Sequence, residues 1–460
     1  RKQEILKEAD IKPQVIDGML KRLEQFIKPF INSLGRTEPK INAHFYISGL
    51  LSDLERKNIE SIAYRYDQDR RALQRFIGTA PWDYQPLQQE LVRQIGLELG
   101  EDDGVIVFDP SGYKKCGCDS VGVQRQWLGR LGKVDNGQVA VFGVLSRDRF
   151  AIPVDVKLYL PKKWTEYPKR CEKAGVPEAE RIFRTKEQLA LEIVSQARQN
   201  GLRYGWVGAD AGYGKGPGFC LELDQMGERF VVDLHSDFPV YLEDPKPYLP
   251  EKTSRKGPKF TRYRTDASSI EVKAAVEGLK LCEQPVLKLR DTTRGSLKVK
   301  ALRFPVYVWD GESENACRFF VLATQTLGPK AETKISLSNA PETMELKTLA
   351  WMQLQRYWVE RAFEDAKSEC GMADYQVRKW SAWHHHMALV MMAMLFMLTE
   401  RIRHEDTYPL LSCSDIEELL SRFLPRRDVT KQEVIRQLEY RHRKRLAAIQ
   451  SHSRNAKLRT

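Results

Sequence analysis

Short apolar stretches beyond residue 100 follow one another in an order that few folds can accept. The order is strand, strand, strand, helix, strand, over residues 105–108, 138–145, 151–160, 185–200 and 204–209. Asp109 directly follows the first strand, and Asp210 directly follows the fourth. Adjacent strands bring their ends within about 5–10 Å of each other. The order therefore predicts an α/β core with two carboxylates at one edge of its sheet.

A turn is the alternative role for each aspartate. Asp109-Pro-Ser-Gly is a good turn sequence, and proline is expected to end the first strand because it cannot donate to a central ladder. Asp210 precedes Ala-Gly-Tyr-Gly and could cap a turn in the same way. The strand before each aspartate favours a chemical role. Asp119 is a weaker candidate because it follows a Cys-Gly-Cys loop and no strand.

Residues 353–367 predict a helix that carries a third carboxylate. At 100° per residue, Arg356, Glu360 and Lys367 fall within about 40° of one another. A stripe with the spacing of a buried helix face runs beside them, formed by Val359, Phe363, Ala366 and Cys370. The helix thus holds a carboxylate between two cations at the boundary of a core. Glu364 lies one turn away, but the spacing of the two cations selects Glu360.

Three carboxylates from separate elements suit a site for two Mg²⁺ ions. Mg²⁺ takes oxygen ligands, uses few protein carboxylates and fills its other positions with water and substrate. Two such ions about 3.5–4 Å apart activate a water or a 3′-hydroxyl and stabilise the leaving oxygen of a phosphodiester. An ordinary salt-bridged helix is the alternative interpretation of Glu360.

Positive charge is concentrated in two segments. The net charge is +12, and residues 251–303 and residues 425–460 each carry +8. This distribution favours a polyanionic partner, although either segment alone is equally well explained as a solvated face. The eight cysteines have no zinc-ligand spacing, which favours reduced thiols in a cytosolic protein. No signal peptide is recognised, and the longest apolar run, of about 12 residues, is shorter than a membrane span.

With these residues assembled, the chain resembles the insertion-sequence transposases of the DDE superfamily. It is most similar to the bacterial cut-and-paste branch, which is marked by Tyr-x2-Arg-x3-Glu-x6-Lys. Arg356, Glu360 and Lys367 match that spacing, and Gln353 stands at the tyrosine position. The resemblance spans residues 45–400, with further similarity in residues 109–113, 120–127, 132–141, 208–214 and 383–386.

The resemblance implies a ribonuclease H-like core of order β-β-β-α-β-α, interrupted by a β-rich insertion and flanked by helical N-terminal and C-terminal regions. It implies that Asp109, Asp210 and Glu360 form the catalytic triad and bind two Mg²⁺ ions, with Mn²⁺ as a substitute. Arg356 and Lys367 would hold DNA phosphates, because both side chains suit that contact. Further DNA contacts are expected on the loop after the first strand, at Lys114, Lys115, Arg125, Arg130 and Lys133.

The implied function is a DNA transposase that cleaves at transposon ends and transfers the 3′-hydroxyls into target DNA. Its partners would be the terminal inverted repeats, the target DNA and a second copy of the chain, without a membrane. Its place would be the bacterial cytoplasm, at the nucleoid. Two alternatives remain: a ribonuclease H-like nuclease or resolvase without strand transfer, and a domesticated DNA-binding derivative.

Five regions are expected along the chain. The first is a helical DNA-binding region in which residues 54–76 form either a helix-turn-helix reader or an ordinary helical pair. This first region covers residues 1–98. It is followed by the first part of the catalytic core at 99–217, the β-rich insertion at 218–345, the closing catalytic helices at 346–403 and the basic helical C-terminal region at 404–460.

Two aromatic features invite a functional interpretation that the sequence does not favour. His384, His385 and His386 would point about 100° apart on a helix, so they cannot all bind one ion, and packing or a DNA-backbone contact is expected. Trp127 could stack on a flipped base, but packing in the core is favoured.

Overall fold

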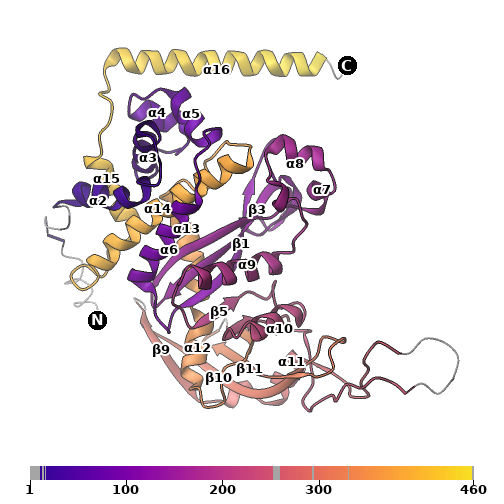
Figure 1. Ribbon diagram of the computed structural model, residues 1–460. Helices are drawn as coiled ribbons and strands as arrows, with labels where there is room; N and C mark the ends of the chain where they lie inside the picture. Colours follow the sequence, from indigo (N-terminus) through magenta and orange to yellow (C-terminus); the bar gives the residue numbers. More distant parts are fainter. Residues whose placement is uncertain are drawn as a thin grey trace.

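One large mixed sheet organises the molecule, as the computed structural model shows (Figure 1). The structure describes residues 11–12, 15, 17–251, 260–292, 295–329 and 331–457. Within these residues the sheet has ten strands in the order β2-β3-β1-β5-β6-β12-β11-β10-β9, with β4 paired to β3. The strands are β1 (Val105–Lys114), β2 (Gln124–Leu128), β3 (Lys133–Arg147), β4 (Phe150–Leu158), β5 (Trp206–Ala209), β6 (Phe230–Asp233), β9 (Val286–Thr292), β10 (Gly295–Val308), β11 (Cys317–Thr326) and β12 (Thr333–Ser338).

The predicted α/β class and the order of the first core elements are confirmed. β1, β3 and β4 precede α9 (Lys186–Gln199), which is followed by β5. β1 is antiparallel to β3 and parallel to β5, and β5 is parallel to β6. Thr185 caps α9 by accepting a hydrogen bond from the Gln188 backbone, as expected for a helix that begins at a threonine.

The expectation that the first strand ends at Phe108 is wrong. β1 continues through Pro110 to Lys114 while it pairs with β3. β5 ends at Ala209, opposite Phe108, so the rest of β1 is paired on one side only. A proline is tolerated in a strand that has such a free side.

The expected long loop between the first two strands contains a further strand. β2 pairs with the start of β3, and the turn between them includes Gly132 at a φ of 59°. β2 has the sequence Gln-Arg-Gln-Trp-Leu, so no apolar run marks it as a strand. Trp127 is 58% exposed on β2, and the expectation that it packs in the core is therefore wrong.

The same sheet continues into the segment expected to be an insertion. That segment contains β6, which lies beside β5, and β12, which pairs antiparallel with β6. It also contains α10 (Gly218–Gln225), α11 (Val272–Gly278) and a two-stranded sheet of β7 (Pro239–Val240) and β8 (Ile270–Glu271). The division of the chain into five regions stays a prediction.

Helices cover both faces of the first half of the sheet. Phe142 of β3 packs edge-to-face on Phe363 of α13 (Arg356–Ser368), with ring centroids 5.1 Å apart. A Cβ on the next residue, Gly143, would lie 2.6 Å from Ile193 of α9. Successive strand residues point to opposite faces, so α13 and α9 lie on opposite sides of the sheet.

The N-terminal helices pack around α14 (Trp380–Arg403), which also contacts β4. They are α2 (Met19–Ile31), α3 (Thr37–Leu50), α4 (Ile59–Arg65), α5 (Arg70–Gly78) and α6 (Gln85–Leu99). Side chains cap α4 and α5, where Asn58 and Asp69 accept backbone hydrogen bonds. A helical pair is therefore present within residues 54–76, and its role as a DNA reader stays a prediction.

The three consecutive histidines are buried, so packing is the one of their two expected roles that the structure confirms. The two ring nitrogens of His385 lie 2.9 Å from the backbone carbonyls of Ile77 and Trp82, and His386 bonds the hydroxyl of Tyr46 at 2.9 Å. Burial lowers the pKa of His384 and His386 to about 3, so both rings are neutral at physiological pH. α14 is long and apolar enough to cross a membrane, but 94% of its apolar window is buried inside the fold.

The remaining helices lie around the sheet and the helices that pack on α14. α7 (Lys162–Thr165) and α8 (Pro168–Ala174) follow β4, and α12 (Leu346–Leu354) leads into α13. α15 (Cys413–Phe423) packs on α14 and α2. The last part of the region expected to be helical forms one continuous helix, α16 (Lys431–Lys457), which lies along the top of the view in Figure 1.

A buried ion pair joins the N-terminal helices to α14. Arg22 of α2 makes a two-pronged contact with Glu400, at 2.7 and 2.6 Å, and the Glu400 side chain is 1% exposed. Breaking a buried pair by removing one partner costs about 3–5 kcal/mol, because the other charge stays buried.

We therefore expect Arg22→Ala to lower the free energy of unfolding by about 3 kcal/mol, the lower end of that range because Arg403 also lies near Glu400. Denaturant unfolding followed by circular dichroism measures the change. Arg93→Ala, which removes a surface pair with Glu90, is the matched control and should change stability little. Equal stability of the Arg22→Ala and native proteins would contradict this account of the pair.

Candidate active site

Three aspartates occupy the same level of three adjacent parallel strands. Phe108 of β1 pairs with Ala209 of β5, and Ala209 pairs with Val232 of β6. The next residue on each strand is an aspartate, which gives a row of Asp109, Asp210 and Asp233. Neighbouring strands lie about 4.8 Å apart, so the row brings three carboxylates together at one edge of the paired region.

The row lies on the side of the sheet that α13 covers. Asp109 pairs with Phe142, and paired residues point to the same face. Phe142 packs on Phe363 of α13, so α13 passes over the face from which the Asp109 side chain projects. This packing brings Glu360, one turn before Phe363, toward Asp109.

Electrostatic coupling connects the predicted triad. The pKa of Asp109 is raised to about 7, chiefly by burial and then by the negative charge of Asp210, and the Glu360 carboxylate also raises it. Arg356 and Lys367 act in the opposite direction. The five residues predicted to form the centre of the site therefore share one electrostatic environment.

The predicted carboxylates differ in exposure. Asp109 and Asp210 are half-buried, and the Glu360 side chain is 63% exposed. Asp210 accepts a hydrogen bond from the Gly212 backbone at 2.9 Å, which closes the turn after β5. Glu364, the alternative to Glu360, is also exposed and pairs with Arg361 at 2.5 Å. Of these two glutamates, Glu360 is the one whose charge acts on Asp109.

Arg356 is held by carboxylates in this structure. Its Nη1 atom donates to Asp233 Oδ2 at 2.8 Å, and its Nη2 atom lies 3.8 Å from Glu360 Oε1. Lys367 is half-buried, with its Nζ atom 5.5 Å from the centre of the Phe363 ring. The guanidinium thus bridges the aspartate row and the glutamate on α13.

Sequence reasoning missed Asp233. The segment 218–345 is expected to be β-rich, but the aspartate within its first strand is not among the predicted site residues. The signal was present, because Asp233 follows the apolar run Phe-Val-Val, just as Asp109 follows Val-Ile-Val-Phe. Burial raises the pKa of Asp233, and Arg356 and Ser336 act against that rise.

Gln353 supports this carboxylate through a buried chain of hydrogen bonds. Its Nε2 atom donates to Ser336 Oγ at 2.6 Å, and that hydroxyl donates to Asp233 Oδ1 at 2.6 Å. At its other end Gln353 accepts from Thr324 at 2.5 Å. These hydrogen bonds connect Thr324, inside the sheet, through Asp233 to Arg356. The residue that departs from the family signature is therefore buried and fully engaged.

Lys186 is a second residue that the sequence did not identify. It is the first residue of α9, and its charge acts on Asp210 and Asp109. Burial is the main cause of its lowered pKa. A cation at the edge of the aspartate row offsets part of the repulsion among the carboxylates.

The chemistry of these side chains fits a hard divalent cation. Mg²⁺ takes carboxylate oxygens together with water and substrate oxygens, and Asp109 is a half-buried carboxyl beside two others. A bound cation would favour the ionised form of that carboxyl. Within the described ranges, however, no three His, Cys, Asp or Glu side chains are grouped closely enough to hold a metal ion. Asp109, Asp210 and Glu360 therefore supply the right ligand atoms but not a closed cage.

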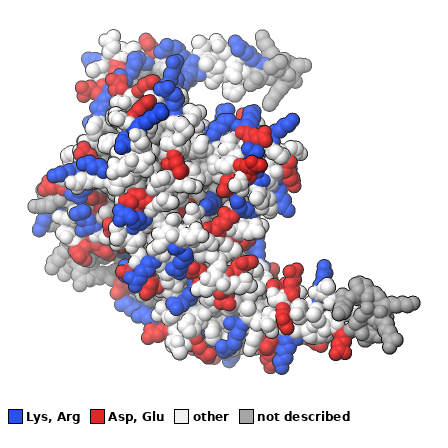
Figure 2. All heavy atoms as spheres, in the orientation of Figure 1, with Lys and Arg blue, Asp and Glu red and all other residues white. Residues whose placement is uncertain are grey.

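The predicted DNA contacts lie along β1, β2 and β3. Arg125 is exposed on β2, on the same face as Trp127, and Lys133 is exposed at the start of β3. Lys114 and Lys133 both approach Asp135, at 3.3 and 3.8 Å. The side chain of Arg130 lies outside the described residues. Figure 2 shows Lys and Arg interspersed with Asp and Glu over the visible face, so the charge is mixed rather than uniformly positive.

Because Gln353 is buried, replacing it with the family's tyrosine should destabilise the protein. Gln353→Tyr removes two hydrogen bonds and adds volume to a filled site, which costs about 1–3 kcal/mol. Denaturant unfolding measures this loss, and Gln25→Tyr on the exposed side of α2 is the control. A Gln353→Tyr protein as stable as the native one would show that the site can accept the family residue.

Comparisons with known proteins give the family of this chain. The chain is similar to a probable transposase for insertion sequence element IS701 from Microchaete diplosiphon, with 30% identity over 226 residues. The match covers 48% of this chain and 54% of the relative, so the chain spans about half the length of that relative. Residues 29–295, more than half of the 460, match the family described as DDE superfamily endonuclease. This chain therefore belongs to the DDE superfamily endonucleases.

Proposed function

We propose that this protein is the DNA transposase of an insertion sequence. In this proposal it cleaves DNA at the ends of its element and joins the 3′-hydroxyls to target DNA. One observation carries the proposal: Asp109 and Asp210 lie side by side on adjacent strands, and the charge of Glu360 acts on Asp109 from the helix above. The family implies a ribonuclease H-like fold, and the β-β-β-α-β order of the core agrees with it.

Asp109, Asp210 and Glu360 would hold two Mg²⁺ ions, and Mn²⁺ would substitute. When bound, the ions supply an activated water or 3′-hydroxyl and stabilise the charge on the leaving oxygen. The sheet fixes Asp109 and Asp210 in position, whereas Glu360 lies on an exposed helix surface, 3.8 Å from the guanidinium of Arg356. The three carboxylates therefore lie near one another without forming a closed cage.

The cations beside the triad would hold the DNA backbone. Lys367 would contact a phosphate as a point charge. Arg356 would do so with its planar guanidinium, once DNA competes with Glu360 for it. Arg125, Arg130 and Lys133 on the β2–β3 hairpin would contact flanking phosphates, and the exposed ring of Trp127 is available to stack on a base.

The proposed reaction needs more than one copy of the chain. Two ends must be joined to one target, so the active complex would contain at least two copies of the chain. Most described residues of α16 are exposed, and the helix carries many cations, which suits a contact with a partner copy or with DNA. The terminal inverted repeats and the target would be the DNA partners, in the bacterial cytoplasm at the nucleoid and without a membrane.

A DNA endonuclease without strand transfer is the second candidate. The family description names endonucleases, and such an enzyme would use the same carboxylates and metal ions. An assay that joins a labelled element end to plasmid DNA separates the two, because a simple nuclease cuts the end but does not join it.

Removing any one carboxylate of the triad should strongly slow the chemistry. We expect Asp109→Asn, Asp210→Asn and Glu360→Gln each to lower Mg²⁺-dependent cleavage and joining about 100- to 1,000-fold, as for loss of one electrostatic stabiliser. DNA affinity should change little, because the phosphate-contacting cations remain. Glu364→Gln is the matched control on the same helix and should keep activity. If the Glu360→Gln protein still joined DNA ends and the Glu364→Gln protein did not, Glu364 would be the third carboxylate in place of Glu360.

Asp233 should act by positioning Arg356 rather than by binding DNA. We expect Asp233→Asn to lower the joining rate about 10- to 100-fold, the usual effect of losing a partner that orients a site residue. The affinity for end DNA and the Mg²⁺ concentration at half-maximal rate should stay close to the native values. A large shift in the Mg²⁺ requirement would instead assign Asp233 to the metal ligands.

A further inference from the structure

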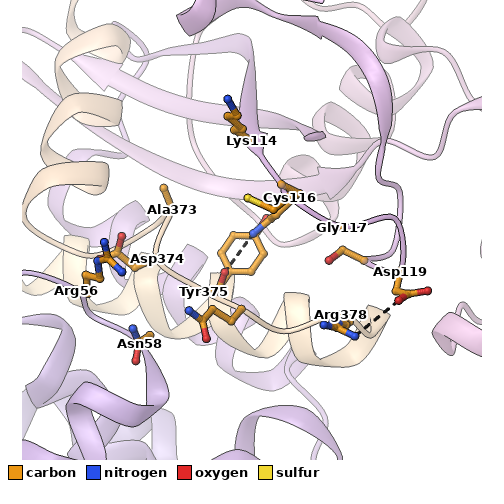
Figure 3. Close-up of a pocket in the computed structure, with 13 residues that line it drawn as sticks. Arg56, Asn58, Lys114, Cys116, Gly117, Asp119, Ala373, Asp374, Tyr375 and Arg378 are labelled. Atoms are coloured by element: carbon orange, nitrogen blue, oxygen red, sulfur yellow. Dashed lines mark hydrogen bonds and ion pairs between the residues drawn. The ribbon is translucent and has the colours of Figure 1, made fainter. Parts of the chain in front are cut away.

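A polar cavity of about 400 Å³ lies beyond the aspartate row, where β1 ends (Figure 3). Three distant segments form it: the turn before α4, the loop after β1, and the connection between α13 and α14. Four cations and two carboxylates are among the residues that line it, namely Arg56, Lys114, Lys115, Arg378, Asp119 and Asp374. Its size is within the range of ligand-binding cavities in proteins.

Lys115 gives this cavity a charge that no carboxylate among the described residues neutralises. Its Nζ atom donates to the backbone carbonyl of Tyr375 at 3.1 Å and lies 3.3 Å from the centre of the Tyr375 ring. Among the described residues, no carboxylate lies within 4.0 Å of it. Burial accordingly lowers the pKa of Lys115 to about 8. A bound anion would stabilise this partly buried charge.

The other cations of the cavity are only partly neutralised. Arg378 lies 3.7 Å from Asp119, which Lys173 also approaches at 3.9 Å. The Asp374 carboxylate already accepts a hydrogen bond from the Lys57 backbone at 2.8 Å. In Figure 3, Arg56 and Asn58 lie on one side of the cavity, and Asp119 and Arg378 lie on the other. The lining thus offers cationic donors from two sides.

Both β1 and α13 lead from the predicted triad to this cavity. Lys114 is five residues after Asp109 on β1, which corresponds to roughly 17 Å at about 3.3 Å per residue. On the opposite side, α13 carries Glu360 and Lys367, and the chain after it reaches the cavity at Ala373.

We propose that the cavity holds a backbone phosphate of the substrate DNA, roughly 17 Å from the phosphate that is cleaved. This inference rests on the proposed DNA-joining function and adds to it a fixed second contact. A base is the less suitable occupant, because Lys115 already covers a face of the Tyr375 ring. A phosphate contact of this kind sets the register of DNA on the protein without reading its sequence.

Two neighbouring thiols allow a direct test in the native protein. Cys116 lines the cavity, and Cys118 lies two residues further along the same loop but does not line it; both are exposed. Alkylation of each can be followed by mass spectrometry, without DNA and with a duplex of arbitrary sequence at low salt. At a DNA concentration of about ten times Kd, we expect Cys116 alkylation to slow about tenfold, in proportion to the free fraction, and Cys118 to slow much less.

The salt dependence of DNA binding gives an independent readout. Each phosphate neutralised by a cation contributes about 0.9 to the slope of log K against log salt. Lys115→Gln should therefore reduce the slope by about 0.9, while Lys115→Arg, which keeps the charge, restores most of it. Lys28→Gln removes the same charge from the exposed side of α2 and should leave the slope unchanged.

The outcomes separate this inference from the proposed function. If the protein binds DNA but Cys116 is not protected and the Lys115→Gln slope equals the native slope, the cavity is not a DNA contact, and the proposed function stands. If the protein fails to bind duplex DNA even at low salt, the proposed function and this inference both fail. If inorganic phosphate protects Cys116 while DNA does not, the cavity is a site for a free anion and the assignment to DNA is wrong.

Discussion

Repulsion among aligned carboxylates is the constraint on which the site depends. The register of β1, β5 and β6 forces Asp109, Asp210 and Asp233 to the same level of the sheet. Two unit charges about 5 Å apart repel by about 3 kcal/mol at the effective dielectric constant typical near a protein surface. The fold retains this arrangement because cations lie around it: Arg356 bonds Asp233, and Lys186 and Lys367 lie within electrostatic reach of Asp109.

The row is neutralised unevenly, and this asymmetry suggests a division of roles. Asp233 has a guanidinium at 2.8 Å and a hydroxyl at 2.6 Å, so its charge is satisfied within the protein. Asp109 has no such partner among its described contacts, and its pKa is raised to about 7. A divalent cation bound by Asp109 and Asp210 would supply what Arg356 supplies to Asp233. The fold thus leaves the carboxylates that would bind metal less satisfied than the carboxylate that orients Arg356.

Local sequence patterns were sufficient to predict the parts of the site that depend on one element each. Asp109, Asp210 and Glu360 were identified because a short apolar strand or a helical stripe marks each of them. The role of Gln353 depends on β12 pairing with β6, which brings Ser336 opposite Asp233 across more than a hundred residues of chain. The extension of β1 through Pro110 likewise depends on where β5 ends. No local pattern contains either fact. The assignment of site residues itself stays a prediction.

Iron-directed cleavage tests most directly whether metal binds among these carboxylates. Fe²⁺ in place of Mg²⁺, with peroxide, generates hydroxyl radicals that cut the polypeptide close to the bound ion. We predict cuts in the segments around Asp109, Asp210 and Glu360, suppressed by excess Mg²⁺ and lost in the Asp109→Asn protein. Cuts confined to other segments, or cuts that Mg²⁺ does not suppress, would contradict the assignment of the metal site to this row.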